Sequence, residues 1–212
     1  MGKIMEAIFC IFYLIATTVV GVLILTKSKS RKQFIIFGVM ALVLVSGDAF
    51  HLIPRILVAF NPSGDYHASL GIGKLVTSIT MTFFYLILYV FYEVRYNVKN
   101  IAIRVVLISL SIARITLCLL PQNDWTGLAP VSWGIYRNIP FVIMGIIIVI
   151  LFARKMDDKP FRFMWIAITL SFAFYIPVVL LADKYPLVGM LMLPKTIMYM
   201  WMVWMGFAAE KA

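Results

Sequence analysis

The sequence predicts an all-α membrane protein, in which residues 1–212 form a single domain of seven transmembrane helices. Of its 212 residues, 63% are hydrophobic and the mean hydropathy is +1.00, which a soluble domain does not need. Apolar runs of about 20 residues, the length that crosses a hydrocarbon core of about 30 Å, recur along the whole chain. Loops rich in Lys and Arg alternate with loops that are poor in them. This alternation predicts an N-terminus outside and a C-terminus inside the cell.

The apolar runs define the expected spans. In chain order they are Ile4–Thr26, Phe34–Phe60, Leu70–Tyr92, Ile101–Leu120, Val131–Phe152, Phe163–Leu181 and Leu187–Phe207. The first run is too long for the apolar region of a signal peptide, so we expect it to be a true span. Prolines lie within four of the runs, at Pro54, Pro140, Pro177 and Pro194. Each should kink its helix, because proline removes a backbone hydrogen bond.

The loop charges also explain the net charge of +10. Residues 27–32 are dense in Lys and Arg, and the third and fifth loops are basic as well. The second and fourth loops, residues 61–67 and 121–127, contain neither Lys nor Arg, and the sixth has only Lys184 beside Asp183. Positive charge placed in this way sets membrane topology, so we expect no nucleic-acid partner. We expect an integral protein of a bacterial cytoplasmic membrane.

Common catalytic and metal-binding signatures are missing from the sequence. It contains no GxSxG elbow, no HExxH helix and no Walker loop. Cys10 and Cys118 both lie inside apolar runs, which is typical of small packing residues. The chain has two histidines, too few for a His-rich metal centre. We therefore expect neither a metal nor a cofactor, and the sequence leaves the oligomeric state open.

The second apolar run carries three ionisable side chains on one face. Asp48, His51 and Arg55 follow one another at i, i+3 and i+7, which places them within roughly 60° of each other around a helix. Charge is costly in hydrocarbon and is tolerated mainly against the protein interior or a water-filled cavity. This stretch is therefore the first candidate for a functional site, although a purely structural polar network between helices would use the same residues.

Other cations fall in the outer halves of the expected spans. These residues are Lys74, Arg114, Arg137 and Lys195. Snorkelling to the interface accounts for Arg55 and Lys74, but Arg114 and Lys195 lie about 10–12 Å from the outer ends of their spans. We therefore predict that all five cations share an outward-facing polar cavity for an anionic ligand, with Arg as a bidentate fork. Nearby hydroxyl and amide groups that could complete it are Ser46, Thr77, Ser78, Thr80, Tyr136, Asn138, Thr196 and Tyr199.

Two functions are compatible with such a cavity, and the sequence leaves both open. In a lipid hydrolase, Asp48 would act as general acid or base, His51 would orient or relay a proton, and the cations would hold the headgroup phosphate. In a transporter or receptor, the same cations would bind a small anionic ligand or a lysophospholipid without chemistry. Membrane lipids are the expected partners in either case.

A resemblance favours the hydrolase. Residues 46–54, Ser-Gly-Asp-Ala-Phe-His-Leu-Ile-Pro, are followed by Gly71-Ile72-Gly73 at the start of the next run and by Tyr85 within it. This pattern resembles the lysoplasmalogenase family of polytopic membrane proteins (the YhhN family). The resemblance covers the second and third runs only. It implies cleavage of the vinyl-ether bond of lysoplasmalogens, with Asp48 as the matching catalytic residue.

A further alternative is a retinal protein. Seven spans, an outside N-terminus and a lysine in the last span resemble the rhodopsins, and Lys195 would then form the Schiff base. The third span carries no carboxylate to act as its counter-ion.

Overall fold

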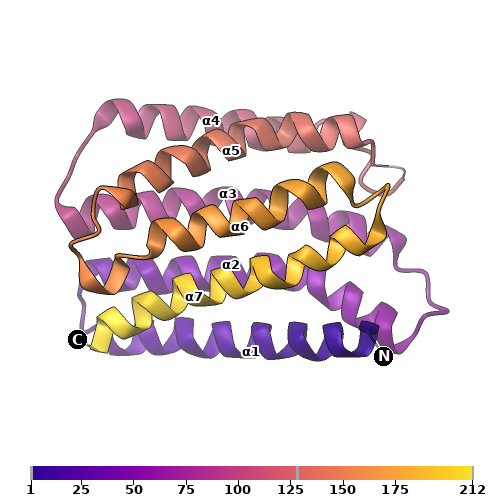
Figure 1. Ribbon diagram of the computed structural model, residues 1–212, viewed down its shortest axis with the longest axis horizontal. Helices are drawn as coiled ribbons and strands as arrows, with labels where there is room; N and C mark the ends of the chain where they lie inside the picture. The colour runs from indigo at the N-terminus through magenta and orange to yellow at the C-terminus, as the bar shows by residue number, and fades with distance from the viewer. Residues whose placement is uncertain (1, 128, 212) are drawn as a thin grey trace.

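The computed structural model of the chain describes residues 2–127 and 129–211, and within them the regular structure is entirely helical (Figure 1). The long helices are α1 (Gly2–Lys27), α2 (Lys32–Phe60), α3 (His67–Tyr96), α4 (Ile101–Leu119), α5 (Val131–Ala153), α6 (Met164–Leu181) and α7 (Met192–Lys211). Short 3₁₀ turns connect some of them: η1 (Pro121–Asn123), η2 (Lys159–Phe161) and η3 (Pro186–Leu191). In this part of the chain, seven segments are long and apolar enough to cross a membrane, which confirms the predicted number of spans.

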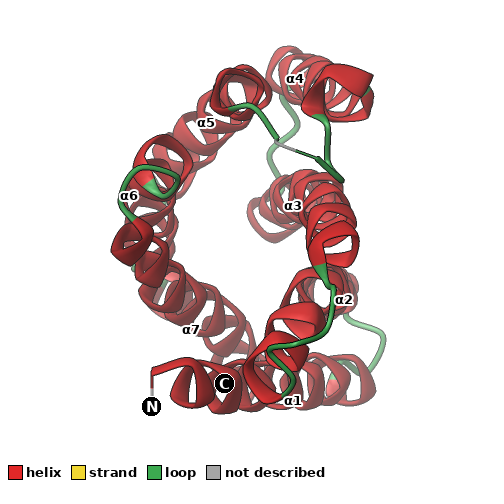
Figure 2. Cartoon of the chain, turned by 90° about the vertical axis from the view of Figure 1, so that its right-hand side faces the viewer, coloured by secondary structure: helices red, strands yellow, loops and turns green. Residues whose placement is uncertain are grey.

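The helices run alternately up and down along the long axis of the molecule. Figure 1 places the N-terminus and the α2–α3, α4–α5 and α6–α7 connections at one end, here called the N-terminal end. The C-terminus and the other connections lie at the opposite, C-terminal end. Viewed along the helices, α1 to α7 form a closed circuit in which α7 returns to pack on α1 (Figure 2). The most extensive contacts are those of α2 with α3 and with α1.

Close approach of α2 and α3 depends on small residues. A side chain at Gly47 would collide with Thr80, and one at Gly73 would collide with the backbone of Phe50 and His51. Thr77 Oγ1 also donates a hydrogen bond of 2.9 Å to the Gly47 carbonyl. Small residues and interhelical hydrogen bonds are typical of helix packing in membranes, where apolar burial gives little drive for association. They bring the start of α3 directly against the His51 turn of α2.

Ion pairs fasten the C-terminal end of the bundle. Arg31 at the start of α2 pairs with Glu210 of α7 at 2.7 Å. Arg95 of α3 pairs at 2.9 Å with Asp158, in the α5–α6 connection. Some of the basic residues that predicted the topology therefore also hold helices to one another.

The structure corrects the expected boundaries at several places. The third span is longer than Leu70–Tyr92 at both ends, since polar residues continue its helical hydrogen bonding, and the fourth ends at Leu119. The last span begins as η3 and becomes α-helical only at Met192. Pro194 is therefore in the first turn of α7, where proline is tolerated without breaking the helix. Pro54 is internal, and Figure 1 shows the last turns of α2 leaning toward α1.

Candidate functional site

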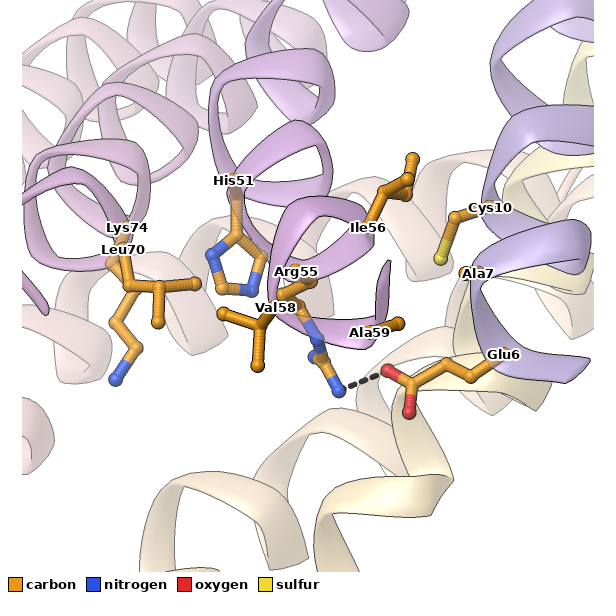
Figure 3. A pocket seen from close by; sticks show the side chains of 10 residues that line it. All are labelled: Glu6, Ala7, Cys10, His51, Arg55, Ile56, Val58, Ala59, Leu70 and Lys74. Carbon is orange, nitrogen blue, oxygen red and sulfur yellow. Dashed lines mark hydrogen bonds and ion pairs between the residues drawn. The ribbon is translucent and has the colours of Figure 1, made fainter. Parts of the chain in front are cut away.

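A pocket opens at the N-terminal end of the bundle between α1, α2 and α3 (Figure 3). Its volume is about 340 Å³. Its lining side chains are Glu6, Ala7 and Cys10 of α1, His51, Arg55, Ile56, Val58 and Ala59 of α2, and Leu70 and Lys74 of α3. The pocket thus brings together three of the predicted site residues, His51, Arg55 and Lys74.

Local structure explains how these three side chains meet. His51 and Arg55 are one helical turn apart on α2, so they share a face. Lys74 comes from the first turns of α3, immediately after Gly73, whose missing side chain lets α3 approach His51. In Figure 3 the ends of Lys74, Arg55 and Glu6 lie at a similar level, and the His51 ring is set farther from them along α2.

The pocket has a net positive charge. Arg55 forms an ion pair with Glu6 across the α1–α2 contact. Among the residues that the structure describes, Glu6 is the only carboxylate that lines the pocket, so Lys74 leaves one positive charge in excess. His51 Nδ1 is buried and has no hydrogen-bond partner among the residues that the structure describes. A bound group that offers hydrogen-bonding oxygens and negative charge would complement these side chains.

Asp48 does not line this pocket. It is 8% exposed, and its carboxylate accepts a hydrogen bond of 2.6 Å from the Tyr13 hydroxyl of α1. It also interacts electrostatically with Lys195 of α7. No hydrogen bond or ion pair joins Asp48 to His51 in the described ranges, although they share a face of α2. Asp48 therefore joins α1 to α2 inside the bundle through its hydrogen bond with Tyr13.

Lys195 and Arg114 lie in the interior, apart from the pocket. The Lys195 ammonium is 4.7 Å from the centre of the Tyr175 ring and 5.2 Å from that of Tyr199. Arg114 is 1% exposed, and its guanidinium lies 3.3 Å from the centre of the Phe141 ring. In the retinal alternative, Lys195 would form the Schiff base and would need a carboxylate counter-ion. The acid that interacts with Lys195 is Asp48, which comes from α2.

Arg137 is engaged elsewhere, at the α4–α5 connection. Its Nη1 donates a hydrogen bond of 2.9 Å to Asn123 Oδ1, and its guanidinium lies 4.3 Å from the centre of the Trp125 ring. Asn123 is fully buried, and its amide nitrogen donates to the carbonyls of Leu117 and Leu120, which closes the end of α4. Arg137 therefore helps to hold this connection in place.

Sequence reasoning missed Asn123, Trp125 and Tyr13. The available signals were an amide and an indole in a short connection without Lys or Arg, and a tyrosine within an otherwise apolar first span. Of the hydroxyl residues expected near the site, several donate to carbonyl groups of their own helix instead: Ser46, Ser78, Thr80 and Thr196.

Within the described ranges, no group of three or more His, Cys, Asp and Glu side chains could hold a metal ion. Comparison with protein-family models, with curated proteins and with solved structures found no match to this chain.

Proposed function

We propose that this chain is a membrane protein that binds the phosphate of a lysophospholipid headgroup, or a small anionic ligand of similar chemistry, in the pocket at its N-terminal end. The observation that carries the proposal is the convergence of His51, Arg55 and Lys74 on one cavity with a single carboxylate. The cavity volume of about 340 Å³ lies at the lower end of the range for ligand pockets. It suits a headgroup, with the acyl chain left in the surrounding membrane.

The chemistry of the lining fits a phosphate ester. Arg offers a planar fork of N–H donors that matches phosphate oxygens, and Lys supplies a compact charge with three donors. Glu6 holds Arg55 in position through their ion pair. Apolar side chains such as Val58 and Leu70 complete the wall, where the glycerol carbons would lie.

Binding without cleavage is favoured over hydrolysis by the position of Asp48. A general acid or base must come within hydrogen-bond reach of the reacting group. The Asp48 carboxylate accepts a hydrogen bond from Tyr13, and the residue is outside the lining of the pocket. Release of an aldehyde from a lysoplasmalogen by the purified protein would support the hydrolase instead, with Asp48 reaching the substrate only after a rearrangement of α1.

We propose that the C-terminal end of the bundle faces the cytoplasm of a bacterial cell and that the pocket opens to the outside. The basic loops lie at the C-terminal end, and positive charge in short loops is retained on the cytoplasmic side.

A cysteine at Ser63 should therefore react with a membrane-impermeant maleimide in intact cells, whereas one at Ser30 should react only after permeabilisation. A Cys10→Ala background removes the thiol that lines the pocket. Labelling of the Ser30→Cys variant in intact cells would contradict this orientation.

The pocket itself is tested by Lys74→Gln. Loss of charge-assisted hydrogen bonds to phosphate should weaken binding of lysophosphatidylglycerol by at least about tenfold. Binding is measured by titration calorimetry of the purified protein in a nonionic detergent. Lys99→Gln is the matched control, since Lys99 is exposed and belongs to the α3–α4 connection, away from the pocket. Equal affinities of wild type and Lys74→Gln would rule out the pocket as the phosphate site.

A further inference from the structure

The interior of the bundle contains a buried guanidinium that the phosphate pocket does not use. Arg114 of α4 is 1% exposed, and its Nε and Nη1 have no hydrogen-bond partner among the residues described. It forms no ion pair in that part of the chain. Phe141 covers one face of the guanidinium. The unpartnered N–H groups lie at the edge of the guanidinium plane, where they could donate hydrogen bonds to a ligand. An arginine side chain keeps its charge in proteins, so this charge needs a counter-charge.

Lys195 of α7 belongs to the same buried neighbourhood. Its ammonium lies 4.7 Å from the centre of the Tyr175 ring. The Tyr175 ring is in turn 6.0 Å from the ring of Phe141, on which Arg114 is stacked. The positive charges of Arg114 and Lys195 also repel each other. Two cations from helices on opposite sides of the bundle therefore face a shared aromatic lining.

The nearby acidic side chains do not balance these two cations. Asp48 interacts with Lys195 and accepts a hydrogen bond from Tyr13. The other buried acids in the described ranges, Glu93 and Glu210, are paired with Arg104 and Arg31. Asp48 therefore offsets the charge of Lys195, and the charge of Arg114 is left in excess inside the membrane. A buried charge without a counter-charge strongly destabilises a folded protein.

We propose that a small monovalent inorganic anion of the chloride class binds between Arg114 and Lys195. One bound anion neutralises the excess charge and accepts hydrogen bonds from the guanidinium edge. The aromatic side chains around it favour a compact ion over a phosphate, whose oxygens would need many more donors. This site is separate from the phosphate pocket, whose lining includes neither cation.

The proposal is tested by the chloride dependence of the melting temperature. Purified wild-type protein is equilibrated in potassium gluconate, and the gluconate is replaced stepwise by chloride at constant ionic strength. The melting temperature should rise along a saturation curve, by about 5 °C when chloride reaches one hundred times its Kd. Bromide should replace chloride. A melting temperature that is the same in both salts would overturn the proposal and leave water as the partner of the guanidinium.

Two variants test whether the chloride-dependent rise in melting temperature comes from the site between Arg114 and Lys195. Arg114→Met should lose the chloride-dependent shift and, in gluconate, should melt at or above the temperature of the wild type, because an uncompensated charge has been removed. Lys74→Gln, in the phosphate pocket, should keep the full shift. Arg114→Met that retains the shift would overturn the proposal.

A second measurement covers the case in which Arg114→Met fails to fold. Equilibrium dialysis of the wild-type protein with radioactive chloride should detect one ion bound per chain, and Lys195→Met should bind it at least about tenfold more weakly. No bound chloride in the wild type, or undiminished binding by Lys195→Met, would contradict the assignment.

Discussion

Replacing Asp48 with asparagine is expected to lower the free energy of unfolding by about 3 kcal/mol, the usual cost of breaking a buried ionic interaction by removing one partner. Asp48 is 8% exposed, accepts a hydrogen bond from Tyr13 and interacts electrostatically with Lys195. Asparagine keeps the size of the side chain and removes its charge, so Lys195 would lose the carboxylate that interacts with it. Reversible unfolding of the purified protein in mixed micelles measures the difference.

Tyr13→Phe is the matched control for this prediction. It removes the hydrogen bond of 2.6 Å but leaves the carboxylate near Lys195, so it should cost only about 1 kcal/mol. An Asp48→Asn variant as stable as the wild type would show that the carboxylate is not needed to balance the buried cations.

Replacing Gly73 with leucine is expected to lower the free energy of unfolding by about 3 kcal/mol, because it overpacks the contact between α2 and α3. A side chain at this position would meet the Phe50 carbonyl and the His51 backbone, which cannot move aside as a flexible side chain can. The variant should also lose binding in the pocket, since Lys74 would move away from His51 and Arg55. Thermal unfolding and calorimetric titration measure the two effects.

Gly189→Leu provides the comparison for the glycine prediction. A side chain added at Gly189 meets nothing within 4 Å, so the same substitution should change stability little. Similar losses from both variants would indicate a general effect of leucine rather than the close α2–α3 contact.

The helical class and the number of spans followed from hydropathy alone. Each span shows up as an apolar run, because the thickness of the membrane fixes its length. Boundaries were less accurate where polar residues extend a helix beyond the apolar run, as at both ends of α3. The 3₁₀ start of the last span had no signal in hydropathy, since η3 and α7 are both apolar.

The candidate site was predictable only within one helix. Helical periodicity correctly placed His51 and Arg55 on one face of α2, and the depth of Lys74 placed it near their level. Periodicity does not say which faces of different helices meet. Arg137 has a depth similar to that of the pocket residues, yet it contacts Asn123 of η1, and Arg114 and Lys195 face the interior. Such pairings depend on the packing of the whole bundle.

The most direct test of phosphate binding is the location of a phosphate group in a crystal structure. The protein would be crystallised with a lysophospholipid whose phosphate carries selenium in place of one oxygen, and the selenium located by anomalous scattering. The Arg55 and Lys74 side chains line the pocket, so the peak is expected within about 4 Å of their nitrogen atoms. A reproducible peak elsewhere on the protein, with the pocket empty, would contradict the proposed function.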